Sequence, residues 1–351
     1  MSEVTLKIAG KQYGGWKSID IRRSLDVAAN TFSLGLTDVW PGEDVPRPVH
    51  IHSACELWID QERIITGYID DVSPKYGNGQ RSTDVDGRSK VAVLIDCALS
   101  LGDKEQSQFN NLGFLAVAQR LASHFGLKVK DEAGISSIPA KRVYRLEPGE
   151  TVFEFLAEHA RVLGVRLISD ADGNLVISRT SNKRVRTELR LGENIEAATP
   201  LFSGRNRFSE YNVIGQTWGS DQTSAAGAAH AIGRAKDSGV PLFRPTVIIP
   251  ETDITLADAT RRAEWQRNLS YGRSHQVTYT VTGWRHADGL WEPNRLVRVH
   301  DDWTGLDGVL WMISDVRYVL DETGGTRAEL TVSPKEGFDL IPLPNEKEIR
   351  W

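Results

Sequence analysis

Cysteine is scarce in this sequence. Its 351 residues include two cysteines, Cys55 and Cys97, which is too few for the disulfide framework of a secreted domain. Nothing else in the sequence indicates an oxidising compartment. We therefore expect two half-buried free thiols in a reducing cytoplasm.

Long hydrophobic runs are also missing. The first residues, MSEVTLKIAGKQYGG, lack the basic segment and apolar core of a secretory signal peptide. No stretch approaches the ~20 apolar residues that a membrane-spanning helix needs. We expect synthesis in the cytoplasm, no integral membrane association and, for any role outside the cell, an exit other than secretion.

Positive charge is not in excess. The 42 Lys and Arg against 47 Asp and Glu give a formal net charge of −5. Proteins that hold DNA tightly usually contain a basic domain, so tight nucleic-acid binding is not expected. The basic segment 179–190, RTSNKRVRTELR, is more typical of a solvated linker than of a phosphate-facing patch.

Motifs for catalysis are missing as well. DGRSK lacks the preceding glycine and the spacing of a phosphate loop, and there is no Gly-X-Ser-X-Gly or His-Glu-X-X-His. His50 and His52 would share one face of a strand, but no third ligand stands at a zinc-site spacing. We predict no catalytic, cofactor-binding or metal-binding residues, and no enzymatic activity.

The segment 169–178, SDADGNLVIS, allows two interpretations. From Asp170 onward its oxygen-bearing side chains stand two apart, as at the start of a calcium loop; Asp-Gly between apolar runs instead favours a β-hairpin. Counted from Asp170, the glycine position of a calcium loop holds Leu175 and the glutamate position holds Ser181. The segment lacks two residues that a calcium loop requires, so the sequence predicts a hairpin.

The first 98 residues consist mostly of short strand-like segments. They are VTLKI, WKSIDIRRSL, TFSLGLTD, CELWID and RIITGYIDDVS, followed by a hairpin turn in KYGNGQRS. Such short, regularly spaced strands, rich in β-branched and aromatic residues, predict a small barrel or sandwich.

Two amphipathic helices follow. In 112–127 the apolar residues recur with the helical period, and Gly126 stands where a C-cap belongs. In 147–165 Pro148 with neighbouring acids suits a helix start, and Gly164 suits its end. The expected buried stripes are Phe114, Leu115, Ala118, Leu121, Ala122 and Phe125 in the first helix, and Phe153, Leu156, Ala160 and Leu163 in the second.

The second half returns to β structure after a third helix. FSEYNVIGQTW is strand-like, 219–239 is small and polar enough for a mobile loop, and 255–273 is helical, with Thr255 and Asp258 placed as a capping box. From residue 276 the predicted strands are QVTYTVTGW, NRLVRVHDD, GVLWMISDVRYVL and TRAELTVSP.

These elements predict a mainly β fold with inserted α/β units: two similar small β-barrel domains and two smaller α/β domains. The first barrel covers 1–103, and an α/β domain with two helices and a hairpin covers 104–182. The second barrel combines 183–217 with 274–340, a loop-helix segment covers 218–273, and a tail covers 341–351.

A weak internal repeat supports two related barrels. In each half an apolar strand ends in aspartate, at Asp60 and Asp301. A longer strand then ends in Ile-X-Asp-Val, at 69–72 and 313–316, and a glycine-containing hairpin and a return strand follow. Chance similarity between hairpins remains the alternative, but two related barrels are the simpler account.

The ten tryptophans are a high number for this chain. Trp284, Trp291, Trp303 and Trp311 are concentrated in the second predicted barrel. Exposed tryptophans could stack on sugars, whereas buried ones belong to a core or a subunit interface. We favour core and interface, because tryptophan is enriched in both.

An ordered set of segments resembles the baseplate hub protein of Mu-like contractile-tailed phages. They are GETVFEFLAEHARVLGVRLISDADGNLVISR, NIEAATPLFSGRNRFSEYNVIGQ, RRAEWQRNLSYGRS and VTGWRHADGLWEPNRLVRVHDDW. The resemblance spans about residues 1–340. More distantly, the chain is similar to the late-control tail proteins of P2-like phages, the T-even hub and the base of type VI secretion spike proteins.

This resemblance implies a virion protein of the tail baseplate, without enzymatic activity or cofactors. It implies a homotrimer whose two barrels per chain form a pseudo-sixfold ring around an axial channel for DNA. The ring would join the sixfold tail tube to the threefold membrane-piercing spike and contact other baseplate proteins. The internal repeat agrees, because a trimer imitates a hexamer only if each chain presents two similar barrels.

Two other functions compete with this one. PGETVFEFLAEHARVLGV resembles the opening of a LysM repeat, which suggests a peptidoglycan- or glycan-binding tail module, although a hairpin follows where LysM continues to a second helix. A cell-wall hydrolase is the other alternative, but no catalytic constellation supports it.

Overall fold

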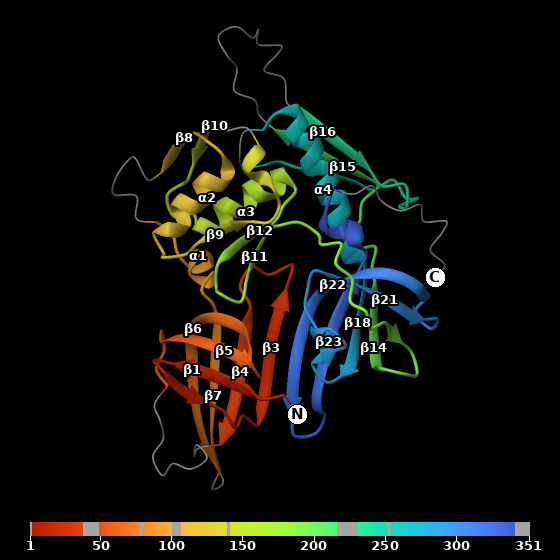
Figure 1. Ribbon diagram of the computed structural model, residues 1–351. Coiled ribbons are helices and arrows are strands. Elements are labelled where there is room, and N and C mark those ends of the chain that lie inside the picture. Colours follow the sequence, from red (N-terminus) through yellow and green to blue (C-terminus); the bar gives the residue numbers. More distant parts are fainter. Residues whose placement is uncertain are drawn as a thin grey trace, which may run out of the picture.

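The computed structural model describes residues 2–37, 49–77, 80–99, 107–138, 141–215, 231–250 and 254–340. The fold is mainly β, as the sequence predicts. Two β-domains lie side by side, and two smaller units that contain helices lie on one end of them (Figure 1). No helix in these ranges is long and apolar enough to span a bilayer.

The first β-domain comprises β1 (Val4–Ile8), β2 (Lys11–Tyr13), β3 (Ser18–Ser24), β4 (Thr31–Thr37), β5 (Ala54–Ile59), β6 (Glu62–Gly77) and β7 (Gln80–Ser89). Buried and less buried residues alternate along β1 and β5, as in strands with one face on a core. The strand segments predicted in residues 1–98 are thus confirmed.

The second β-domain comprises β13 (Leu189–Arg190), β14 (Ile195–Phe202), β18 (His275–Thr282), β21 (Arg295–Asp301), β22 (Leu306–Asp321) and β23 (Gly325–Ser333), with the small hairpin β19 (Arg285–His286) and β20 (Gly289–Leu290). The basic segment predicted as a linker runs along this domain, since β13 pairs in parallel with β21.

The expectation of two closed barrels is not met. In the described ranges the two β-domains share one 13-stranded sheet in the order β14-β18-β23-β22-β3-β4-β7-β6-β5-β1-β2, with β21 on β22 and β13 on β21. One edge of β22 pairs with β21 along its first half and with β3 along its second half. Because β3 occupies that edge, the second domain does not close on itself.

The α/β unit after the first β-domain comprises α1 (Ala92–Asp96), β8 (Gln108–Leu112), α2 (Phe114–Ser123), β9 (Val129–Asp131), the 3-10 turn η2 (Ile135–Ser137), β10 (Lys141–Arg145), α3 (Val152–Leu163), β11 (Arg166–Ser169) and β12 (Leu175–Ser178). Both predicted helices are present. Gly126 and Gly164 take the left-handed conformation that ends a helix.

The helix faces differ slightly from the predicted stripes. Thr151 and Glu154 form a capping box, so α3 begins beyond Pro148. Phe155 and His159 are buried, whereas Phe153 and Leu163 pack only partly against the core. The same holds in α2, where Val117 is buried and Leu115 and Phe125 are partly buried. The other members of the predicted stripes are confirmed as buried: Phe114, Ala118, Leu121, Ala122, Leu156 and Ala160.

The inserted unit comprises β15 (Glu210–Gly215), β16 (Ala231–Lys236), β17 (Pro245–Ile248) and α4 (Leu256–Ser274). The capping box of Thr255 and Asp258 is confirmed. Two expectations are wrong here. β15 pairs with β16 and β17 instead of joining the second β-domain, and residues 231–236, expected in a loop, form β16. Residues 219–230 and the tail 341–351 lie outside the described ranges.

Arg166 in β11 joins the separate units. Its side chain donates to Asp26 at 2.7 Å and to the Gly337 carbonyl at 3.0 Å. Its guanidinium lies 5.2 Å from the Trp265 ring of α4 and 4.5 Å from the Phe338 ring of η3 (Lys335–Phe338). One nearly buried cation therefore contacts the first β-domain, the inserted helix and the C-terminal segment of the second β-domain.

We expect Arg166→Ala to lower the free energy of unfolding by about 3 kcal/mol, because it leaves Asp26 without its buried partner and removes two ring contacts. Denaturant titration measures the loss. Arg273→Ala is the matched control, since Arg273 also faces Asp26, at 4.0 Å, but is exposed. Equal effects of the two substitutions would contradict the joining role of Arg166.

Candidate channel face and domain junction

The two β-domains repeat each other down to their irregularities. The pairing of β6 with β7 shifts at Ile69/Asp71, and the pairing of β22 with β23 shifts at Ile313/Asp315. These β-bulges fall within the two Ile-X-Asp-Val segments noted in the sequence. Bulges set the bend and twist of a strand, so matching bulges give the two sheets the same local shape.

A second pair of bulges repeats in the preceding hairpins. The pairing of β5 with β6 shifts at Leu57/Trp58, and that of β21 with β22 shifts at Val299/His300. In this register Ile59, rather than Asp60, corresponds to Asp301, so the predicted match of the two aspartates is off by one residue. The repeat itself is real, because chance similarity would not reproduce both irregularities.

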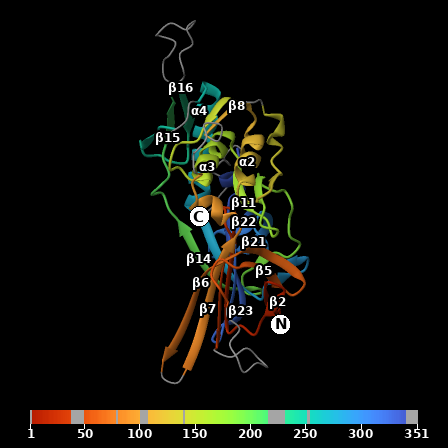
Figure 2. The ribbon, with the colours of Figure 1, turned by 90° about the vertical axis from the view of Figure 1, so that its left-hand side faces the viewer.

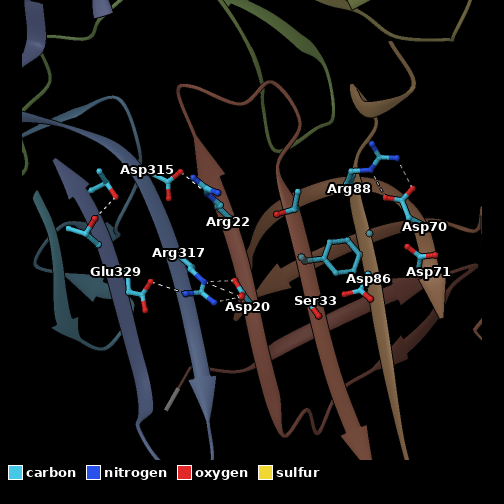
Figure 3. Close-up of a pocket in the computed structure, with 15 residues that line it drawn as sticks. Asp20, Arg22, Ser33, Asp70, Asp71, Asp86, Arg88, Asp315, Arg317 and Glu329 are labelled. Carbon is cyan, nitrogen blue, oxygen red and sulfur yellow. Dashed lines mark hydrogen bonds and ion pairs between the residues drawn. The ribbon is translucent and has the colours of Figure 1, made fainter. Parts of the chain in front are cut away.

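One face of the shared sheet is polar and charged. The side chains that line its hollow are Asp20, Arg22, Thr31, Phe32, Ser33, Asp70, Asp71, Asp86, Arg88, Thr278, Asp315, Arg317, Glu329 and Thr331 (Figure 3). Alternation along each strand explains the face: Ile19 and Ile21 of β3 point into the core, so Asp20 and Arg22 point away from it. Six carboxylates and three guanidinium groups make this face acidic.

Ion pairs across β3 and β22 lock the junction between the two β-domains. Arg22 donates to Asp315 at 2.8 Å, and Arg317 donates to Asp20 at 2.9 Å (Figure 3). Arg317 also donates to Glu329 of β23 at 3.0 Å. Paired charges that share donors form a network, which holds more firmly than isolated surface pairs.

The junction perturbs the ionisation of its charged groups. Burial raises the pKa of the Asp315 carboxyl, although Arg22 acts in the opposite direction. Hydrogen bonds to Asp20 raise the pKa of the Arg317 guanidinium. These shifts follow from burial and the ion-pair geometry, as in a structural network of paired charges.

Within the described ranges, no three His, Cys, Asp or Glu side chains are placed to hold a metal ion. His50 and His52 lie in an exposed turn, not on the strand considered from the sequence. Both cysteines are free; Cys97 is half-buried, and Cys55 lies in the core, where burial raises its pKa to about 12.

The hairpin predicted in SDADGNLVIS is confirmed, since β11 pairs antiparallel with β12. Asp170 accepts hydrogen bonds from Lys130 at 2.5 Å and from the Asn174 backbone at 2.8 Å. Asp172 pairs with Arg63 of β6, and the Thr66 hydroxyl donates to the Ala171 carbonyl at 2.7 Å. The turn therefore seats the α/β unit on the first β-domain.

Of the four tryptophans noted in the second β-domain, three lie in the core and one lies on the surface. Trp284, Trp291 and Trp311 are buried, as expected for a core. Trp303 is 89% exposed, at the turn between β21 and β22. Asp301 shapes this turn by accepting from the backbone amides of Trp303 and Thr304, so the exposed ring is held on an ordered turn.

Residues 3–89 match the family "Mu phage baseplate assembly protein GpP-like, N-terminal". Residues 91–179 match "Baseplate hub protein gp44-like, second domain", and residues 255–341 match "Mu phage baseplate assembly protein GpP, fourth domain". Matches at both ends of the shared sheet define the chain as a phage tail baseplate protein.

A full-length relative makes the assignment more specific. The baseplate hub protein gp44 of Escherichia phage Mu is 31% identical over 356 residues, which covers 99% of this chain and 91% of gp44. The chain belongs to the family of the Mu baseplate hub protein gp44, which confirms the resemblance seen in the sequence.

Solved structures agree with this assignment. The 43 kDa tail protein of prophage MuSo2 from Shewanella oneidensis is 35% identical with a TM-score of 0.84, covering 96% of this chain and all of that one. A tail protein from Neisseria meningitidis MC58 is 26% identical with a TM-score of 0.80, covering 97% and 98%. An E. coli type VI secretion component, 14% identical with a TM-score of 0.59 and covering 97% and 80%, shares the fold.

We expect Asp170→Asn to destabilise the protein by about 1 kcal/mol at neutral pH, with no response to calcium. Burial works to raise the pKa of Asp170, but the hydrogen bonds from Lys130 and Asn174 outweigh it and lower that pKa. A carboxyl group whose pKa is lower in the folded state stabilises the folded protein at pH values above its unfolded pKa. This stabilisation is lost as the pH falls through the folded pKa.

The difference in stability between wild type and Asp170→Asn should therefore shrink as the pH falls below about 4. Thermal unfolding at several pH values, with calcium and with a chelator, measures it. Glu193→Gln, which replaces an exposed acid, is the control. A chelator-sensitive wild type would restore the calcium-loop interpretation.

Proposed function

We propose that the protein is the structural hub of a contractile-tail baseplate, a homotrimer whose six β-domains form a ring around an axial channel. The repeated bulges carry the proposal. Because the two β-domains of a chain have the same strand order and the same irregularities, three chains present six similar units. Such a ring fits a sixfold tube on one side and a threefold spike on the other.

The charged face of the shared sheet is the proposed channel wall. The α/β and inserted units lie at one end of the shared sheet (Figures 1 and 2). The excess of carboxylates on the charged face repels phosphates. An acidic wall lets DNA pass without holding it, which agrees with the absence of a basic domain.

We further propose the partners and the organisation of the hub. The tail tube, the spike and other baseplate proteins are its partners in the virion, and its role is not enzymatic. The helical units extend the ring beyond the β-domains. We assign four domains as in the sequence analysis, except that the inserted one begins after β14 and therefore includes β15. A shared fold with a type VI secretion component supports a spike-proximal position.

Mass in solution tests the ring. We expect about three times the 39.0 kDa of one chain by analytical ultracentrifugation, and rings with a central hole in electron micrographs. A protein that stays monomeric at all concentrations would contradict the hub. Sedimentation with peptidoglycan and clearing of a cell-wall suspension test the glycan-binding and hydrolase alternatives, and we expect neither.

Charge reversal tests the channel wall. Asp86→Lys should give the trimer salt-sensitive binding of short DNA duplexes, while the wild type binds none, because each ring gains positive charge on the wall. Fluorescence anisotropy measures the binding. The control is Glu147→Lys, which makes the same charge change at an exposed site of the α/β unit. Equal DNA binding by both variants would refute the assignment of the charged face as the channel wall.

A further inference from the structure

Each β-domain has one free strand edge, and the corresponding edge in the other β-domain is paired. Within the described ranges, residues 72–76 of β6 have no backbone partner on the edge that faces away from β7, whereas the corresponding edge of β22 pairs with β3. In the part of the chain that the structure describes, the outer edge of β14 has no backbone partner from Ala197 to Leu201. These free edges lie at opposite sides of the molecule (Figure 1).

The internal repeat makes β14 the counterpart of β3. β3 pairs with β4, and β14 pairs with β18 in the same place of the strand order. Through these partners Ile21 corresponds to Pro200 and Arg22 to Leu201. The matching bulges likewise make Val316 correspond to Val72 and Arg317 to Ser73.

We propose that β14 of one protomer pairs antiparallel with residues 72–76 of β6 in the next protomer, in the register that β3 and β22 use within the chain. This inference rests on the proposed trimer and names the surfaces that close it. Transfer of the β3–β22 register gives the pairs Val72–Phe202, Ser73–Leu201, Pro74–Pro200, Lys75–Thr199 and Tyr76–Ala198.

Exposure supports this pairing. Tyr76 is 90% exposed, Leu201 54% and Phe202 44%, although all three lie on strands of the main sheet. At the β3–β22 junction the counterparts of Tyr76 and Phe202 are Leu320 and Arg23, and both are partly buried there. A neighbouring strand would cover Tyr76 and Phe202 in the same way, and exposed apolar groups gathered on a free edge mark an interaction surface.

The two seams differ in chemistry. The β3–β22 seam carries Arg22–Asp315 and Arg317–Asp20 pairs. At the corresponding positions the proposed seam has Leu201 with Asp71 and Thr199 with Ser73, so no arginine–carboxylate pair forms there. A β14 strand that displaced β3 would leave Asp315 without Arg22 and Arg317 without Asp20, which disfavours the wrong pairing.

The prolines fit an edge that is paired only in part. Pro74 and Pro200 offer no N–H and lie opposite each other in the proposed register. Proline is tolerated in a sheet at such edge positions. The backbone bonds of this seam therefore lie on either side of the proline pair, and the gap keeps unrelated strands from extending either edge.

The seam is heterologous, so it determines how the ring closes. Each chain uses β14 toward one neighbour and β6 toward the other, which generates a closed ring of three if the rotation is threefold.

The exposed Trp303 lies on the turn between β21 and β22, which corresponds to the β5–β6 turn of the first β-domain. In that turn Asp60 accepts from Arg285 of the other β-domain at 2.9 Å. Trp303 is therefore placed to contact the next protomer.

Disulfide trapping tests the register. In a Cys97→Ser background, the Ser73→Cys/Leu201→Cys variant should form covalent trimers on mild oxidation, seen on non-reducing gels. The two positions form a directly opposed pair on one face, where cross-strand Cβ atoms are about 5 Å apart. Each single variant should stay uncrosslinked, and a mixture of the two single variants should give dimers only.

The control is Ser73→Cys/Phe202→Cys, whose side chains point to opposite faces and should not crosslink. Covalent trimers in the control but not in the matched variant would refute the register. Crosslinks in a single variant would indicate an isologous contact and refute the heterologous seam. A trimer by mass without the expected bond overturns the pairing and leaves the hub intact, whereas a monomer overturns both.

A second experiment needs no oxidation. Phe202→Asp should weaken trimer formation roughly tenfold or more, since it places a charge in the apolar seam. Leu256→Asp is the control, because Leu256 is 61% exposed at the start of α4, where an acid is favourable. Sedimentation equilibrium gives the two association constants; equal weakening of both variants would count against the seam.

Discussion

The antiparallel pairing of β3 with β22 is the constraint on which the molecule depends. It fuses two β-domains into one sheet, so their relative orientation is set by backbone hydrogen bonds. It also makes the core one continuous cluster that runs through both domains. A flexible linker between two barrels would have left that orientation free; the shared sheet fixes it, and with it the single charged face.

The two faces of the shared sheet differ in chemical character. Strand alternation sends apolar side chains into the core and leaves charges on the other face. Acids exceed arginines on that face, and the arginines are held in ion pairs across the strands. In the channel that we propose, such a network of paired charges with residual carboxylates gives a wall that is rigid and repels phosphate.

The helical units are attached to this base by few but well-defined contacts. The hairpin of β11 and β12 rests on β6 through Asp172 and Ala171. Arg166 joins the same hairpin to the inserted helix and the C-terminal segment. At its other end the inserted helix meets its own sheet so closely that a Cβ on Gly233 would lie 2.1 Å from the Ala259 backbone. The units are thus docked through residues that lie far apart in the sequence.

The sequence by itself determined the local features: the hairpin at 169–178, the capping box at Thr255, the glycine helix ends and the Ile-X-Asp-Val repeat. Each depends on residues close together in the chain, or on a pattern that a strand or helix must show. Tertiary structure decided the rest. Which edge β22 offers to β3, why β15 leaves the main sheet for β16, and why Trp303 is exposed while Trp311 is buried all depend on non-local strand partners. Every strand offers the same backbone donors and acceptors, and the side chains that favour one partner lie far away in the sequence, so only the folded chain identifies it.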